Sequence, residues 1–292
     1  MAALAKALEP TEWSLFSVLL TSSYGGWGVG SLDQDVKDIA QCVRCVQEYK
    51  QSISPSEGKT VVMGHSTGSQ DVLHYLYQPN PLPEHSEQFQ GRLKHIVRPQ
   101  LDGAILQAPM SDREGLQAAI KGEEGTAQGT EMRAAYDQLV DFAKRQPYVT
   151  GDHQQKLDAI LPMNLVAKVG LPADTPLSAR RFLSLASPDS PEKPAEDDLF
   201  SSDLTDQRLR ETFGAVAERG LLLSKMMFLY SGNDDFAAPW VDKAKLMQRW
   251  NKASNGKYDE EGSTVIPGAS HNVRDEGQEE LIERVLGYLK RV

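Results

Sequence analysis

Cysteines, long apolar runs and clustered basic residues are scarce in this sequence, and each scarcity excludes a class of protein. Only two cysteines occur among 292 residues, which excludes a small fold held together by disulfides. No run of about 18 apolar residues is present, so we expect no membrane-spanning helix. The N-terminal stretch is short and broken by Pro10, unlike a secretory signal. We therefore expect a cytoplasmic protein.

The charge balance argues against two kinds of partner. The formal net charge is −10 and lysine and arginine form no stripe, so neither nucleic acid nor an anionic membrane surface is expected. The sequence has no histidine, cysteine and acidic residues at metal-ligand spacing, and no phosphate-binding loop with its lysine. We therefore expect no metal and no cofactor. Hydrophobic residues make up 40% of the chain, enough for the core of one domain with insertions.

The most informative motif is Gly-x-Ser-x-Gly, with Ser66 at its centre. A short apolar run at 60–63 precedes it and predicts a buried strand, and residues 69–77 predict a helix. Strand, tight turn and helix are the setting of a nucleophile elbow, in which a strained turn presents the serine hydroxyl. The alternative is a Gly/Ser-rich turn that has this pattern by chance.

The neighbours of the serine have predicted roles of their own. We expect both Gly64 and Gly68 to be required as glycines, because the strand and the helix pass too closely at the turn to leave room for side chains. The backbone amide of Thr67, at the start of the helix, would point toward a developing oxyanion.

A glycine-rich segment at 26–31 lacks the features of a nucleotide-binding loop. We interpret it as a loop at the edge of the catalytic cleft. Four residues are predicted to contact the substrate there and at the elbow: Gly25, Gly26, Trp27 and His65.

Strands and helices alternate along the chain, which predicts an α/β fold with a mostly parallel sheet covered on both faces. Strands are expected at 14–21, 60–63, 103–107, 225–230 and 263–266. Helices are expected at 33–49, 69–77, 240–251 and 277–290.

No convincing strand occurs between 107 and 225, where helical patterns at 130–145, 176–186 and 205–217 alternate with loops. We predict a helical lid at 111–220, inserted between the two parts of a hydrolase core at 1–110 and 221–292. A helical extension without a catalytic role is the alternative. The proline-rich acidic loop at 187–198 is expected to be mobile.

A serine nucleophile needs a base and a group that orients the base, and this fold orders them Ser, Asp/Glu, His. His271 alone among the histidines follows the last predicted strand. Two adjacent aspartates follow the preceding strand, and their spacing from a glycine and a proline favours Asp235 over Asp234. The predicted triad is therefore Ser66, Asp235 and His271. The other histidines are His65, His74, His85, His95 and His153.

The two cysteines form a C-x-x-C pair, Cys42 and Cys45, within an amphipathic helical pattern. A redox pair is one interpretation of this spacing. We favour the interpretation that both cysteines act as small buried hydrophobic residues. Their free thiols would then indicate a reducing compartment.

With these residues in hand, the chain resembles a fungal and plant α/β-hydrolase family whose fungal members include siderophore esterases that cleave fusarinine-type hydroxamate siderophores inside the cell. The resemblance covers nearly the whole chain and implies the same triad. Its matching segments are 20–28, 31–35, 63–71, 108–114, 199–204 and 235–243.

The start of the chain departs from that family. The resemblance implies several strands before the elbow, one of which leads into a loop with the second oxyanion amide. Here residues 1–8 read as the helix that follows that loop, and 14–21 is the one clear strand before the elbow. We favour a shortened gene model or fragment over a divergent member that closes its sheet without these strands.

The leading hypothesis is a serine esterase acting on a small ester, with a siderophore as the best single substrate. A lactonase or amidase using the same triad is an alternative. A hydrolase-like binding protein without turnover is the non-enzymatic alternative. The oligomeric state is not predicted.

Overall fold

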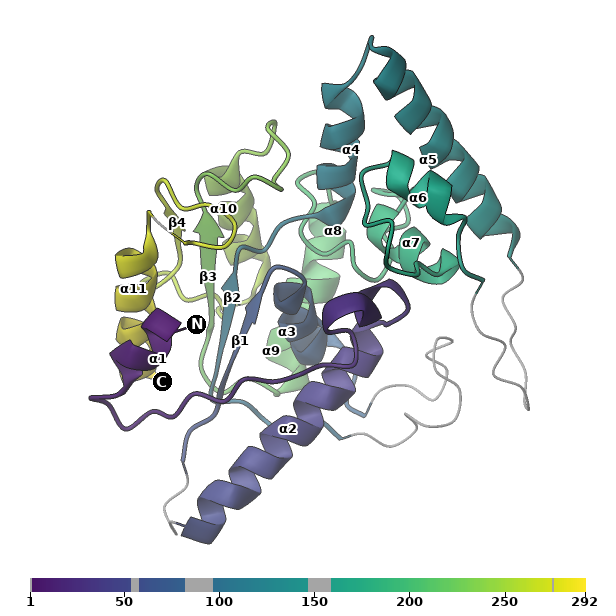
Figure 1. The fold of residues 1–292 in the computed structure, drawn as a ribbon. Helices are drawn as coiled ribbons and strands as arrows, with labels where there is room; N and C mark the ends of the chain where they lie inside the picture. Colours follow the sequence, from purple (N-terminus) through teal and green to yellow (C-terminus); the bar gives the residue numbers. More distant parts are fainter. Residues whose placement is uncertain (1, 54–57, 82–96, 147–158, 275) are drawn as a thin grey trace, which may run out of the picture.

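The computed structural model describes residues 2–53, 58–81, 97–146, 159–274 and 276–292 (Figure 1). Its strands are β1 (Val61–His65), β2 (Gly103–Gln107), β3 (Met226–Ser231) and β4 (Thr264–Ile266). Its helices are α1 (Ala2–Leu8), η1 (Tyr24–Gly28), α2 (Leu32–Ile53), α3 (Thr67–Tyr77), α4 (Asp112–Gly122), α5 (Ala127–Arg145), α6 (Met163–Lys168), α7 (Ala179–Ala186), α8 (Asp206–Leu209), η2 (Arg210–Gly214), α9 (Ala215–Arg219), α10 (Lys243–Ala253) and α11 (Gln278–Arg291). None of the described helices is long and apolar enough to cross a membrane.

The four strands form one parallel sheet in the order β1-β2-β3-β4. Because all four run the same way, their carboxyl ends meet at one edge, where residues that follow different strands can come together. In β1 and β2 the register pairs the last residues, His65 and Gln107. The parallel sheet and four of the five expected strands are therefore confirmed, with ends shifted by a few residues.

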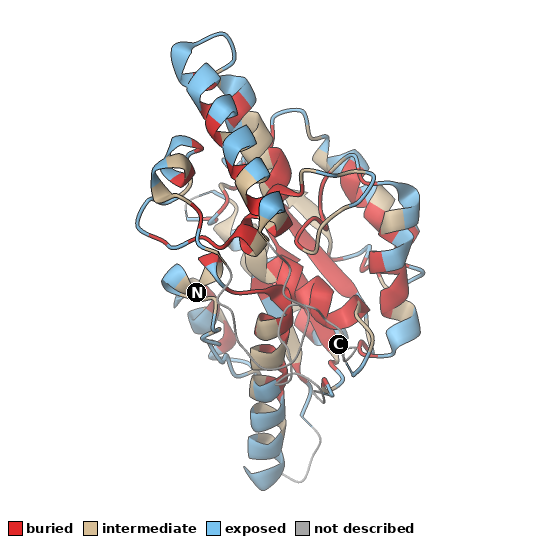
Figure 2. Cartoon of the chain, turned by 90° about the vertical axis from the view of Figure 1, so that its right-hand side faces the viewer, coloured by how far each residue is buried: buried red, intermediate tan, exposed pale blue. Residues whose placement is uncertain are grey.

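The sheet is covered on both faces, because alternate side chains of each strand point to opposite sides. Phe228 of β3 packs into a cluster with α2, α3, α9, η2 and α10, whereas its neighbour Leu229 packs into a second cluster with α1 and α11. Trp250 is fully buried in the first cluster and stacks on Phe213 and Tyr230. Figure 2 shows the buried strands in the middle, with helices whose outer faces are exposed.

A helical layer consisting of α4, α5, α6 and α7 stands above the carboxyl edge of the sheet (Figure 1). It has its own apolar cluster, in which Leu139 of α5 and Phe182 of α7 are fully buried and Trp27 of η1 is partly buried. The expected helices at 130–145 and 176–186 are α5 and α7. Phe200 and Phe213, which follow this layer, pack instead into the cluster beside the sheet. The boundary predicted at 220 remains a prediction.

The loop expected to be mobile is held by hydrogen bonds. Ser187 Oγ accepts the backbone N–H of Ala195 at 2.8 Å, and Asp197 and Asp198 at its end are buried. The sequence misleads here because prolines and acidic residues typical of disorder also occur in loops whose carboxylates pair with neighbouring helices, as Asp197 does with Arg181 of α7. A second polar, proline-rich segment at 79–99 is also predicted from the sequence to be a surface loop, and its residues 82–96 lie outside the described residues.

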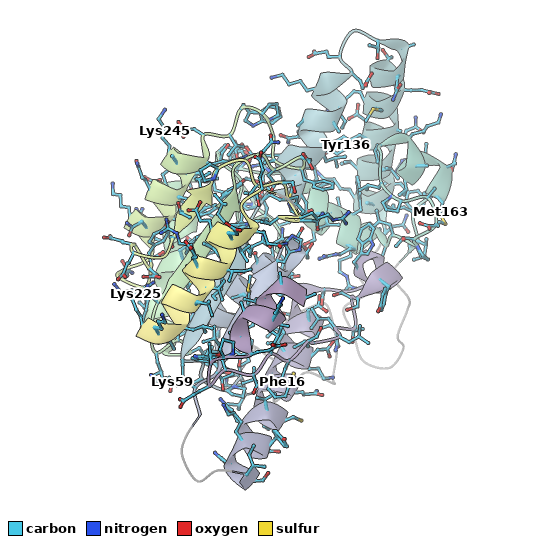
Figure 3. All side chains as sticks on the ribbon, turned by 60° about the vertical axis from the view of Figure 1, so that its left-hand side comes forward. Phe16, Lys59, Tyr136, Met163, Lys225 and Lys245 are labelled. Carbon is cyan, nitrogen blue, oxygen red and sulfur yellow. The ribbon has the colours of Figure 1, made fainter. Side chains whose placement is uncertain are left out.

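The strand expected at 14–21 is not formed. The segment is extended but has no ladder partner among the described residues, and its end is held by α2, where Asp38 Oδ2 accepts the backbone N–H of Thr21 at 2.6 Å. Its side chains at 14–19 remain exposed, with Phe16 at 46% (Figure 3). A cavity of about 540 Å³ separates this segment from β1 and α2 and extends to His65.

The prediction of two buried cysteines is also wrong. Cys45 is exposed on α2, and Cys42 is half-buried against the cavity. Both are free thiols. The buried face of α2 contains Val36 and Val43, as the helical pattern predicts. Cys45 does not lie on that face.

Candidate active site

The elbow predicted around Ser66 is present. β1 ends at His65, α3 begins at Thr67, and Ser66 between them has φ 57° and ψ −124°, a conformation that non-glycine residues rarely adopt. A side chain on Gly64 would collide with the backbone carbonyl of Gly68, so the glycine at 64 is required. Gly68 itself has open space around the position of a Cβ, and the prediction that it too must lack a side chain is wrong.

His271 is buried in the loop that follows β4 and is hydrogen-bonded to an aspartate. Its Nδ1 lies 2.9 Å from both carboxylate oxygens of Asp234. Such a contact fixes which ring nitrogen carries hydrogen and leaves Nε2 for chemistry. The parallel sheet thus brings together residues that follow β1, β3 and β4.

The expectation that Asp235 pairs with His271 is corrected by this contact. Asp234 is buried, and its Oδ1 also accepts the backbone N–H of Phe236 at 3.0 Å, which turns the chain so that Asp235 faces solvent. Counting from the flanking glycine and proline missed this turn, because an aspartate that bonds to the backbone two residues later shifts the loop by one position.

Two aromatic rings enclose the imidazole of His271. The ring centroid of His65 lies 4.9 Å away, and that of Phe236 lies 4.8 Å away in an edge-on arrangement. Among the described residues no hydrogen bond joins Ser66 Oγ to His271, and such bonds often tighten only when substrate binds. The serine–histidine contact is therefore part of the proposal below.

The residues predicted to contact substrate are divided between two places. Gly25, Gly26 and Trp27 lie in η1, where the carbonyl oxygen of Trp27 accepts Arg181 Nε at 3.0 Å and so connects the loop to α7. His65 lies beside His271, and its Nε2 is 3.0 Å from the carbonyl oxygen of His271. Thr67, the first residue of α3, has a backbone N–H at the helix end that makes no intrahelical bond. Substrate contact by any of these residues remains a prediction.

A group of ionisable residues on and around α3, in which His74 and Asp33 are buried and Glu196 is partly buried, was missed by the sequence reasoning. His74 of α3 is fully buried, and its Nε2 lies 2.8 Å from Asp33 Oδ1 and 3.2 Å from Glu196 Oε1. Three such atoms could also hold a metal ion, but the other ring nitrogen of His74 has no hydrogen-bond partner among the described residues. Metal-ligating histidines usually have one, so the group fits a hydrogen bond between His74 and Asp33 better than a metal site. His85, His95 and His153 lie outside the described residues.

A second polar set connects this region to the helical layer. Gln70 Nε2 donates to Asp112 Oδ2 at 2.7 Å and to the carbonyl oxygen of Asp197 at 3.1 Å. Arg181 Nη1 lies 2.6 Å from both carboxylate oxygens of Asp197. Burial raises the pKa of Asp71 well above its ordinary value, and nearby Asp35 adds to the increase. Acidic residues within the apolar pattern of α2 were the sequence signal for this network.

The shifted pKa of Glu196 should make the free energy of unfolding depend on pH. Burial raises its pKa from 4.5 to about 7; His74 opposes the increase and Asp33 adds to it. Between these two values the folded chain binds the proton more tightly than the unfolded chain, so stability falls as pH rises. Glu196→Gln removes this dependence. We expect the variant to exceed the wild type by roughly 1–3 kcal/mol at about pH 8 and to match it at about pH 4 in urea unfolding.

The matched control is Glu192→Gln, because Glu192 lies in the same loop with an exposed side chain. Its stability difference from the wild type should stay near zero at both pH values. A Glu196→Gln difference that is the same at both pH values would contradict the shifted pKa.

The chain is similar to a described protein family and to several fungal proteins. Residues 1–290 match the family described as "Protein of unknown function (DUF1749)". Fusarinine C esterase sidJ of Aspergillus fumigatus is 49% identical over 99% of this chain and 83% of its own length. Esterase AN6793 of Emericella nidulans is 44% identical over 98% of this chain and 80% of its own. The structure of siderophore hydrolase EstB from Aspergillus fumigatus is 48% identical with a TM-score of 0.82, over 99% of this chain and 84% of that one.

The parallel sheet and the strained serine elbow define the α/β-hydrolase fold, and the esterases that match the chain at 44–49% identity identify it as a carboxylic ester hydrolase. The predicted fold class and enzyme class are thus confirmed. At this identity and coverage, the chain belongs to the DUF1749 family, together with the fungal esterases that it matches.

Proposed function

We propose that the chain is a serine esterase in which Ser66 is the nucleophile, His271 the base and Asp234 the residue that orients the base. The buried pair between Asp234 and His271, at the strand edge that carries the Ser66 elbow, is the observation on which this assignment depends. It replaces Asp235 in the predicted triad and retains the other two residues.

In the proposed reaction His271 Nε2 takes the proton of the Ser66 hydroxyl as its oxygen attacks the ester carbonyl. The N–H of Thr67 stabilises the negative oxygen that forms. The tetrahedral species then breaks its bond to the alcohol, which leaves with the proton from His271, and an acyl-enzyme remains on Ser66. Water, activated by the same imidazole, attacks the acyl group and releases the acid. Asp234 stabilises the imidazolium in both halves of the reaction.

We propose a siderophore ester of the fusarinine type as substrate. This assignment is supported by two relatives at 49% and 48% identity whose names give fusarinine C and siderophores as what they act on. The helical layer from α4 to α7 stands above the same sheet edge as the elbow, and we propose that it acts as the lid that shapes the substrate pocket. A cytoplasmic location belongs to this proposal, supported by the two free thiols.

The test is a substrate panel with the purified chain. Fusarinine C, in its iron-free and ferric forms, is incubated beside a simple lactone and the amide analogue of the ester, and products are measured by mass spectrometry. We expect opening of the fusarinine C ester bonds and slower or no cleavage of the amide. Cleavage of the lactone or amide with fusarinine C left intact would overturn the substrate assignment and leave the serine mechanism in place.

A further inference from the structure

The backbone carbonyl of His271 is held by side chains from two other strands. His65 Nε2 lies 3.0 Å from this oxygen and Gln107 Nε2 lies 3.4 Å from it. His65 ends β1, Gln107 ends β2, and the two are partners in the ladder between these strands. The loop that carries His271 follows β4, at the far side of the sheet. The two hydrogen bonds therefore connect that loop to the strand ends next to the nucleophile.

The protonation of His65 follows from its partner. A carbonyl oxygen can only accept, so Nε2 of His65 must carry hydrogen. Loss of surrounding water lowers the pKa of His65, while its hydrogen bond to the carbonyl of His271 opposes this change. The ring is thus neutral at neutral pH, with its hydrogen directed to the loop. A neutral ring can pack 4.9 Å from the imidazole of His271 without repelling the imidazolium that forms during the reaction.

Among the described residues, the other backbone hydrogen bonds of this loop run within it and to the turn after β3, as from the N–H of Asn233 to the carbonyl oxygen of Ala269. Asp234 fixes the ring through Nδ1, but it does not set how far the whole loop stands from Ser66. His65 is the residue immediately before Ser66, so a bond from His65 to the backbone of His271 sets the spacing between nucleophile and base directly. Misplacement of a catalytic group by about 1 Å can lower a rate by about 100-fold.

We propose that His65 is a positioning residue: with Gln107, it holds the His271 loop so that the imidazole stays within reach of Ser66. This inference depends on the proposed serine mechanism. It gives His65 a different role from the substrate contact predicted from the sequence, because its Nε2 is already used by the backbone of His271. Such a role requires a ring or amide that can donate at the position of Nε2.

The test compares His65→Phe, which keeps an aromatic ring and loses the donor, with His65→Gln, whose side-chain amide can donate from nearly the same position. On an ester that the wild type hydrolyses, we expect His65→Phe to lower kcat by roughly 10- to 100-fold with KM little changed. His65→Gln should recover most of that loss. Gln107→Leu should lower kcat by a few-fold, since its hydrogen bond is the longer one.

Met63→Leu is the matched control, because Met63 lies two residues earlier on the same face of β1. Its kcat should equal that of the wild type. A rise in KM with unchanged kcat in His65→Phe would show that His65 contacts substrate and would overturn the proposal. Equal kcat in His65→Phe and the wild type would overturn it too.

Two further readouts separate this proposal from others. Thermal unfolding of each variant shows whether the fold is intact, and if His65→Phe fails to fold, Gln107→Leu with the same kcat and KM criteria decides. The proton on Nδ1 of His271, followed by NMR, should exchange faster in His65→Phe, and this needs no substrate. Failure of the wild type to hydrolyse any ester would overturn the proposed function, whereas slow proton exchange retained in His65→Phe would overturn the positioning role alone.

Discussion

Replacing Ser66 by alanine will lower hydrolysis of an accepted ester by roughly 10⁶-fold, to the residual rate that substrate binding and the oxyanion donor support. In the proposed mechanism the Ser66 hydroxyl is the group that forms the covalent bond to the acyl carbon, so its removal takes the nucleophile away. The measurement is kcat on the ester, together with labelling by a fluorophosphonate probe, which reacts with an activated serine. The wild type should be labelled, and Ser66→Ala should not.

Ser52→Ala is the control for this prediction, because Ser52 donates to the carbonyl oxygen of Tyr49 on the exposed end of α2. It should keep both wild-type turnover and labelling. Labelling that persists in Ser66→Ala would place the nucleophile elsewhere. A folded wild type without any labelling would favour the hydrolase-like binding protein instead of an enzyme.

Replacing Asp234 by asparagine will lower kcat by roughly 10⁴-fold, while the same change at Asp235 will leave kcat within about 3-fold of the wild type. The amide of asparagine would present hydrogen to Nδ1 or favour the wrong tautomer of His271, and then Nε2 could not accept the serine proton. Asp235 is exposed and makes no contact with His271 among the described residues, so its loss removes only a solvated charge.

The two adjacent substitutions control for each other, because both remove one carboxylate from one loop. Circular dichroism checks that Asp234→Asn remains folded. The opposite pattern, with activity lost at Asp235 and kept at Asp234, would contradict the pairing in the structure. It would restore the assignment that spacing alone suggested.

The sheet was predictable from the sequence because its strands are short apolar runs bounded by glycines and polar residues. β2 was predicted with its observed ends, since every one of its residues is buried. The segment at 14–21 has a similar apolar character, but a strand also needs a partner for its backbone, and local composition does not provide that information. The sequence thus predicted a strand correctly where an apolar run is both buried and paired with a neighbouring strand.

The site was predictable in its parts and less so in its contacts. Ser66 and His271 follow from one local motif and from chain order. The choice of Asp234 depends on the direction of a turn, which a bond to the backbone of Phe236 determines. Gln107 was missed altogether, although a polar residue that ends an otherwise apolar strand is a usable signal. The contact between His74 and Glu196 joins residues remote in sequence, and neither position has a motif.

The bonds between η1 and α7 bear on how this enzyme can be redesigned. Gly28 accepts the backbone N–H of Ser178 at 2.8 Å, and any side chain at this glycine would collide with the carbonyl of Pro176. In a chimera whose helices α4 to α7 come from another esterase, the contacts between η1 and α7 would therefore no longer fit. Residues 22–30 should be exchanged together with these helices. In recombination between homologues, we likewise expect folded products when the glycine-rich turn and α7 come from the same parent.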